Sequence, residues 1–170
     1  MTTKSKDKGK EWFQMKVNIG PVPNWRFYHN WFYDWFGYTP KQKTSVKIHN
    51  YDTWSMDHTL APIILPMLVQ LKETKHGSPF VDNADVPKEL RLTKKQEKRY
   101  LEEADTDPKH FERWDWILDE MIWAFEQKCR DDWMEDYDYN KWDSEGAKAH
   151  QERMSNGFRL FGTYYENLWD

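Results

Sequence analysis

The sequence predicts a mainly α-helical fold, with about four helices around an aromatic core and a small two-stranded β element (a minor α+β component). Apolar residues recur every three or four positions in several long segments, which is typical of helices with one buried face. Two short segments instead alternate apolar and polar residues, as half-buried strands do. Aromatic residues make up 17% of the 170 residues, with 11 Trp, so we expect several indoles at a ligand pocket or an interface rather than in the core.

The domain organisation follows from composition. Residues 1–10 carry four Lys and one Asp, and are predicted to be a disordered basic tail. Residues 11–170 are predicted to form a single helical domain, with a surface excursion at 77–108 that contains a short helix. The sole cysteine, Cys129, excludes an intrachain disulfide and a cysteine-built metal site. The absence of an apolar signal region or of a run of about 20 apolar residues argues against membrane association.

The strands and the first two helices come next. Residues 13–19 and the segment "TSVKIHN" alternate apolar and polar side chains, and predict two strands. Residues 24–36, "NWRFYHNWFYDWF", have aromatic residues at helical spacing and predict the first helix. The second helix lies in "YDTWSMDHTLAPIILPMLVQLKE", where Pro62 and Pro66 are expected to bend or split it. Its predicted buried stripe comprises Trp54, Asp57, Ala61, Ile64, Leu68 and Leu71.

The last two helices carry most of the predicted core. The third is expected to start near Asp107, with Pro108 in its first turn, and the fourth to span residues 145–168. Gly157 and Gly162 are expected to weaken the fourth helix locally. The core-facing residues are predicted to be Phe111, Trp114, Leu118, Met121 or Ile122, Phe125, Met154, Phe158, Phe161, Tyr165 and Leu168. A second stripe on the third helix is acidic and is interpreted as a solvated face; it comprises Glu112, Asp115, Asp119 and Glu126.

Three blocks of the sequence resemble a family of uncharacterised proteins encoded by tailed bacteriophages. The blocks are "DTWSMDHTLAPIILPMLVQLKE", "RWDWILDEMIWAFE" and "GFRLFGTYYENLWD". With "WRFYHNWFYDWF" ahead of them, the resemblance covers residues 25–170 apart from 77–108. It implies a phage origin and a location in the host cytoplasm during infection, with packaging in the virion left open. The family has no established activity, so the resemblance implies little chemistry.

Asp57 and His58 follow Trp54 and form the first candidate site. Asp57 shares the apolar stripe of its helix, so we expect it to be at least partly buried and therefore paired. Trp54, His58, Arg113 and Arg159 are the candidate partners. The pattern favours a structural polar network, with a ligand site as the alternative.

A second candidate site is an indole–acid–indole series on the third helix, formed by Trp116, Glu120 and Trp123. Such a series suits stacking on a base or docking of a partner, although it can equally cover a neighbouring helix. The predicted ligand-binding residues are thus Trp54, Asp57, His58, Trp116, Glu120 and Trp123.

No catalytic residues, metal site or cofactor are predicted, and the chain is interpreted as a non-enzyme. The six histidines are scattered, and neither a glycine-rich phosphate loop nor a nucleophile elbow occurs. A centre built from Asp119, Glu120 and Glu126 with Asp57 and His58 is the alternative for a metal. The acidic stripe is more simply a solvated face.

The predicted function is that of a non-catalytic phage accessory protein that binds a small ligand, for example a nucleotide-like one, or a host protein, in counter-defence. The alternative is a virion or assembly component that acts through subunit contacts. A formal charge of −4 argues against nucleic acid as a partner. Self-association is expected, with a dimer favoured over a monomer, because two strands leave exposed edges.

Overall fold

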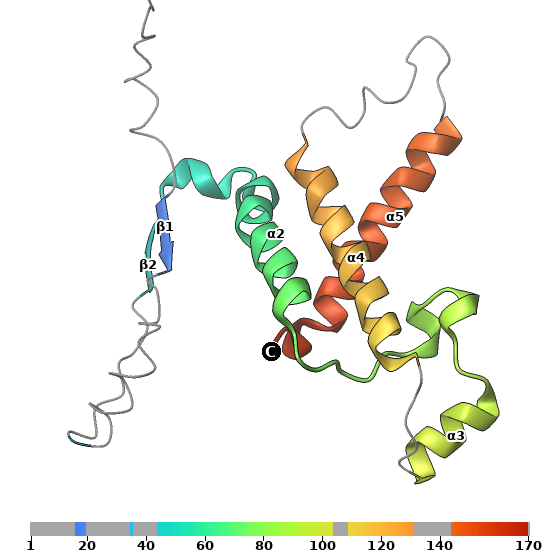
Figure 1. Cartoon of the computed structure of the whole chain (residues 1–170). Coiled ribbons are helices and arrows are strands. Elements are labelled where there is room, and N and C mark those ends of the chain that lie inside the picture. Colours follow the sequence, from blue (N-terminus) through green and yellow to red (C-terminus); the bar gives the residue numbers. More distant parts are fainter. Residues whose placement is uncertain (1–15, 20–34, 36–43, 104–108, 131–143, 170) are drawn as a thin grey trace, which may run out of the picture. The chain divides into compact units, whose positions relative to one another are not determined.

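The structure is a computed structural model that describes residues 16–19, 35, 44–103, 109–130 and 144–169 (Figure 1). It confirms the mainly helical class with a small β element. The chain divides into two compact units, Met1–Met56 and Asp57–Asp170, and each is described by itself. The single domain predicted over 11–170 stays a prediction, because compactness does not establish independent folding. The predicted tail at 1–10 lies outside the described residues.

The first unit contains the predicted strand pair. Strands β1 (Lys16–Ile19) and β2 (Thr44–Lys47) are antiparallel, with Val17 opposite Val46. A 3-10 turn follows at Asn50–Thr53, and the Asp52 carboxylate accepts a hydrogen bond of 2.7 Å from the backbone N–H of His49. The helix predicted over residues 24–36 lies outside the described residues apart from position 35, which is helical.

Helix α2 (Met56–Thr74) is continuous through both of its prolines, so the predicted split does not occur. Pro62 and Pro66 each leave the carbonyl four residues earlier without its helical donor. Both prolines lie on exposed positions of the helix, where solvent can satisfy those carbonyls. The fully buried residues of the helix are Ala61 and Leu68, which are seven positions apart and share one face.

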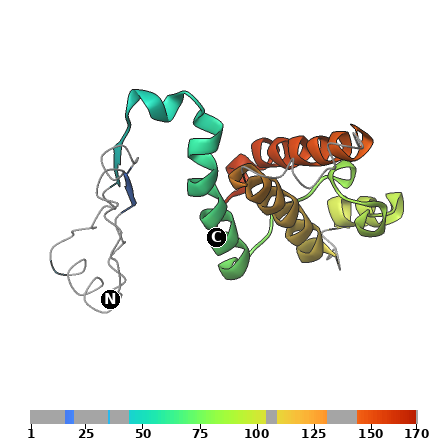
Figure 2. The same ribbon diagram turned by 90° about the horizontal axis from the view of Figure 1, so that it is seen from above.

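The core of the second unit lies between α4 (His110–Cys129) and α5 (Ser144–Thr163), which cross as Figure 2 shows. The crossing is close because α5 has a glycine there. A Cβ atom added to Gly157 would lie 2.4 Å from the Cβ of Ala124 and 2.6 Å from the carbonyl oxygen of Glu120. The expectation that Gly157 only weakens its helix is therefore incomplete, because this residue permits the crossing. The buried apolar residues of the two helices are Trp114, Ile117, Leu118, Met121, Ala124, Phe125, Met154 and Leu160.

Two residues that were predicted to face the core from the last two helices are exposed, as are Trp54 and Asp57 of the stripe predicted on the second helix. Phe111 lies in the first turn of α4 and is 56% exposed, and Tyr165 is 65% exposed. Helix α5 ends at Thr163, and a 3-10 turn at Tyr165–Asn167 follows. The prediction extended the α-helical spacing of buried residues to Tyr165. Because the 3-10 turn has a different spacing, Tyr164 is buried and Tyr165 is exposed.

Residues 77–108 were predicted to be a surface excursion, and this prediction is wrong for the first part of the segment, which contributes buried residues to the core. Val81 and Val86 belong to the core cluster, and Leu92 is buried. The predicted short helix exists as α3 (Lys94–Glu103). The three buried apolar residues are five and six positions apart in an irregular segment and show no helical or strand period, so sequence periodicity could not identify them as core.

Candidate functional site

An apolar groove in the second unit runs between α2 and the C-terminal end of α5. Its volume is about 1010 Å³. One wall is a face of α2, whose lining residues recur at helical spacing from residue 60 to residue 74. The other wall is the segment 161–169. The lining residues are Leu60, Ile64, Pro66, Met67, Leu68, Gln70, Leu71, Thr74, Phe161, Tyr165, Leu168 and Trp169.

The groove exposes large apolar side chains, and none of the described residues that line it is charged. Met67 is 56% exposed, and Trp169 is 63% exposed. Its described polar residues are Gln70 and Thr74. The hydroxyl of Thr74 donates a hydrogen bond of 2.9 Å to the backbone carbonyl of Gln70. A continuous apolar surface that includes Trp, Tyr and Met is typical of a surface that binds a partner.

The lysines at the C-terminal end of α2 are directed away from the groove, toward α4. Lys75 pairs with Asp115 at 2.5 Å, and Lys72 pairs with Asp119. The two aspartates belong to the acidic stripe that was interpreted as a solvated face. The stripe is therefore partly used to hold α2 against α4, and the groove side of α2 keeps its apolar character.

The predicted site at Trp54, Asp57 and His58 is not a buried polar network. Asp57 is exposed and pairs with Lys128 of α4 at 2.5 Å, a partner that the sequence did not suggest. The hydrogen bond from Lys128 holds the pKa of Asp57 below its usual value. His58 is exposed, and Trp54 belongs to the first unit. The expectation that Asp57 is at least partly buried is wrong, because the apolar stripe of α2 begins to be covered only at Ala61, whereas the expectation that it is paired is confirmed.

The indole–acid–indole series lies along α4, and two of its members meet α5. Glu120 is buried and accepts two hydrogen bonds from Arg153, at 2.7 and 3.0 Å. The Arg153 guanidinium also lies 3.9 Å from the ring centroid of Trp123. The bond to Glu120 raises the pKa of Arg153. Trp116 packs against the core. These contacts agree with the interpretation that the three residues cover a neighbouring helix. A ligand-binding role for them stays a prediction.

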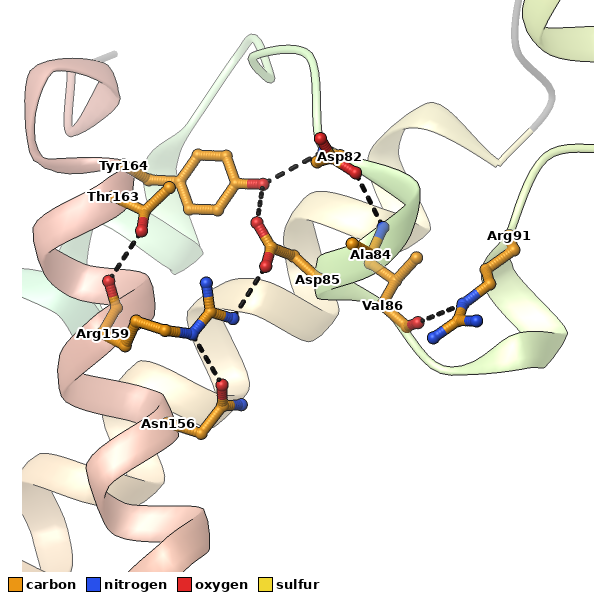
Figure 3. Close-up of polar contacts among 9 residues, drawn as sticks. All are labelled: Asp82, Ala84, Asp85, Val86, Arg91, Asn156, Arg159, Thr163 and Tyr164. Atoms are coloured by element: carbon orange, nitrogen blue, oxygen red, sulfur yellow. Dashed lines mark hydrogen bonds and ion pairs between the residues drawn. The ribbon is translucent and has the colours of Figure 1, made fainter.

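A polar cluster that the sequence did not indicate joins residues 82–86 to α5 (Figure 3). The Tyr164 hydroxyl accepts a hydrogen bond of 3.1 Å from the backbone N–H of Asp82 and donates one of 2.8 Å to Asp85. Arg159 donates to Asp85 at 2.7 Å and to the side chain of Asn156 at 3.0 Å.

Burial raises the pKa of Tyr164 to about 12. The hydroxyl is therefore protonated at neutral pH and acts as a hydrogen-bond donor. The cluster holds the irregular segment against the core, and its polar groups hydrogen-bond to one another.

The described part of the chain contains no group of three or more His, Cys, Asp or Glu side chains that could hold a metal ion. Nor does any helix in the described ranges combine the length and apolarity needed to cross a membrane. Comparison of the chain with protein-family models, curated proteins and solved structures gives no match. The resemblance to tailed-phage proteins therefore stays a prediction.

Proposed function

We propose that the protein is a non-catalytic binding protein that receives apolar side chains of a host protein in the groove between α2 and residues 161–169. The observation that carries this proposal is that the described lining residues are uncharged and include the exposed Met67, Tyr165 and Trp169. Residues of these types dominate the binding energy of protein interfaces.

The lining favours a protein segment over a nucleotide-like ligand. Among the residues that the structure describes, the lining contains neither Lys nor Arg and so supplies no opposite charge for a phosphate. Residues 60–74 of α2 extend the groove along about 20 Å at the helical rise of about 1.5 Å per residue. This length suits a partner helix whose apolar stripe lies in the groove, as in other helix-in-groove complexes.

The setting of this binding is part of the same proposal. The blocks shared with tailed-phage proteins support an accessory protein that acts in the host cytoplasm during infection, in counter-defence. A groove that captures a helix of a host protein provides a means to block that protein without catalysis.

Fluorescence anisotropy tests the proposal with a fluorescein-labelled helical peptide that has a leucine stripe and uncharged glutamine flanks (the neutral peptide). The variant Met67→Gln/Trp169→Ala should bind it at least about tenfold more weakly than the unmodified protein, because two apolar contacts are lost.

The matched control is Met56→Gln/Trp54→Ala. Met56 is 57% exposed, close to the 56% of Met67, and both control residues lie outside the groove lining. This variant should bind within about twofold of the unmodified protein. Absence of binding to the unmodified protein, or an equal loss in both variants, would refute the proposal.

A second copy of the chain is the competing occupant, and the predicted dimer makes it a necessary control. Sedimentation equilibrium at micromolar concentration distinguishes the two. If a mass above the 20.8 kDa of one chain falls to that value in Met67→Gln/Trp169→Ala, the groove is a dimer contact and the host-protein assignment is wrong. A dimer that persists in this variant uses another surface and leaves the groove available.

A further inference from the structure

We infer that the helix bound in the groove carries basic residues on both flanks of its apolar stripe, and that Glu73 and Glu166 pair with them. The inference rests on the proposed function, because it specifies the chemistry of the partner at the same groove. Its basis is the distribution of charge at the two edges of the groove.

Lys72 near the C-terminal end of α2 and Lys75 directly after the helix already have ion-pair partners. Lys72 and Lys75 direct their ammonium groups to Asp119 and Asp115 of α4. Glu73 follows the lining residue Gln70 by three positions, so it lies on the same side of the helix. Its side chain is exposed. The net charge at this edge is therefore that of a carboxylate.

On the opposite wall, Glu166 directly follows the lining residue Tyr165 and is exposed. Within the ranges that the structure describes, neither Glu73 nor Glu166 has an ion-pair partner. Among the described residues, each wall of the apolar groove thus has one exposed carboxylate without an ion-pair partner beside it. A helix with an apolar stripe and lysine or arginine beside it complements this arrangement in shape and in charge.

The size of the effect is set by solvent exposure. Exposed ion pairs are screened, so each pair should strengthen binding by about two- to fivefold at low salt. The two pairs together should give about four- to twenty-fivefold, and most of this preference should disappear at about 0.5 M salt. The pairs therefore select among partners and accelerate encounter, while the apolar stripe supplies most of the affinity.

The test compares three fluorescein-labelled peptides that share one leucine stripe and differ only in their flanks: lysine, glutamine or glutamate. The unmodified protein should bind the lysine peptide most tightly and the glutamate peptide most weakly. Glu73→Gln/Glu166→Gln should lose most of this ranking yet bind the glutamine peptide as before. The matched control Glu89→Gln/Glu112→Gln removes two exposed carboxylates that, unlike Glu73 and Glu166, do not adjoin any lining residue along the chain, and it should keep the ranking.

The outcomes separate this inference from the proposed function. If all three peptides bind equally, or if the control variant loses the ranking as fully as Glu73→Gln/Glu166→Gln does, the inference is wrong and the groove remains a binding surface. If none of the peptides binds, the proposed function fails and the inference fails with it.

Discussion

The crossing of α4 with α5 and the groove between α2 and residues 161–169 bring helical segments together in opposite ways. At the crossing, Gly157 has no side chain, and the backbone of α5 approaches Ala124 and the carbonyl of Glu120. At the groove, large side chains such as Met67 and Trp169 remain exposed between the two walls. Side-chain size at the contact therefore separates a surface that stabilises the fold from one that is available to a partner.

The ion pairs that join the helices differ in burial: the pair between α4 and α5 has a buried carboxylate, whereas a pair that joins α2 to α4 is more exposed. The pair between Glu120 and Arg153 joins α4 to α5, and its carboxylate is buried. The pair between Lys72 and Asp119 joins α2 to α4 and is more exposed, at 33% and 55% of the two side chains. Loss of a partner should be costly at the first pair and nearly neutral at the second.

The largest expected effect is at the crossing. Gly157→Ala places a Cβ atom too close to backbone and side-chain atoms of α4, so we expect a loss of about 2–3 kcal/mol in the free energy of unfolding. Gly162→Ala is the matched control in the same helix, because nothing lies within 4 Å of the added Cβ. It should gain about 0.5–1 kcal/mol. Urea denaturation measures both, and a Gly157→Ala protein as stable as the unmodified one would show that the crossing is looser than described.

The next effect concerns the buried carboxylate. Arg153→Met leaves Glu120 unpaired and should cost about 1–2 kcal/mol, less than for a fully buried pair because half of the Arg153 side chain is exposed. Lys72→Met should change stability by less than about 0.5 kcal/mol. A double-mutant cycle of Arg153→Met with Glu120→Gln measures the coupling directly. Equal effects of Arg153→Met and Lys72→Met would remove the distinction between the two pairs.

A smaller effect is expected from the polar cluster around Tyr164. The pKa of this tyrosine is raised from 10.0 to about 12 in the folded protein, so the unfolded chain releases this proton first as pH rises. The stabilisation is complete below about pH 10 and is lost progressively toward pH 12. The free energy of unfolding should therefore fall more steeply over this range in the unmodified protein than in Tyr164→Phe. Parallel curves would show that Tyr164 titrates normally.

The smallest effect is expected at Asp57. Its pKa is lowered by Lys128, so its contribution is present above the usual carboxyl pKa and is lost as pH falls below it. Because the side chain is 61% exposed, Asp57→Asn at neutral pH should destabilise no more than Lys72→Met. Thermal unfolding checks this, and a loss as large as that of Arg153→Met would restore the buried site predicted from the sequence.

Much of the fold could be predicted because local patterns determine it. Alternation in the first unit predicted the strand pair, and helical spacing predicted Trp114, Leu118, Met121 and Phe125 as core. Errors arose where a helix ends or begins. The prediction extended the period of α5 through Tyr165, whereas the 3-10 turn after Thr163 buries Tyr164.

The groove could not be predicted, because it depends on which segments become neighbours. Met67 and Trp169 are about a hundred positions apart in the chain, and a helical stripe does not indicate whether another element covers it. The partners of Asp57 and Lys72 depend likewise on the side of α2 that faces α4. The sequence also predicted several indoles at a ligand pocket or an interface; Trp169 is exposed in the groove, and a binding role for it stays a prediction.

The most direct test of the account uses the methionine methyl groups as local probes in an NMR titration with the neutral peptide. Met67 lies in the groove, Met121 and Met154 are buried at the α4–α5 contact, and Met56 is exposed outside the groove. The account predicts a shift of the Met67 methyl signal, with the other three signals unchanged. Shifts at Met121 and Met154, or an unchanged Met67 signal while the peptide binds, would contradict it.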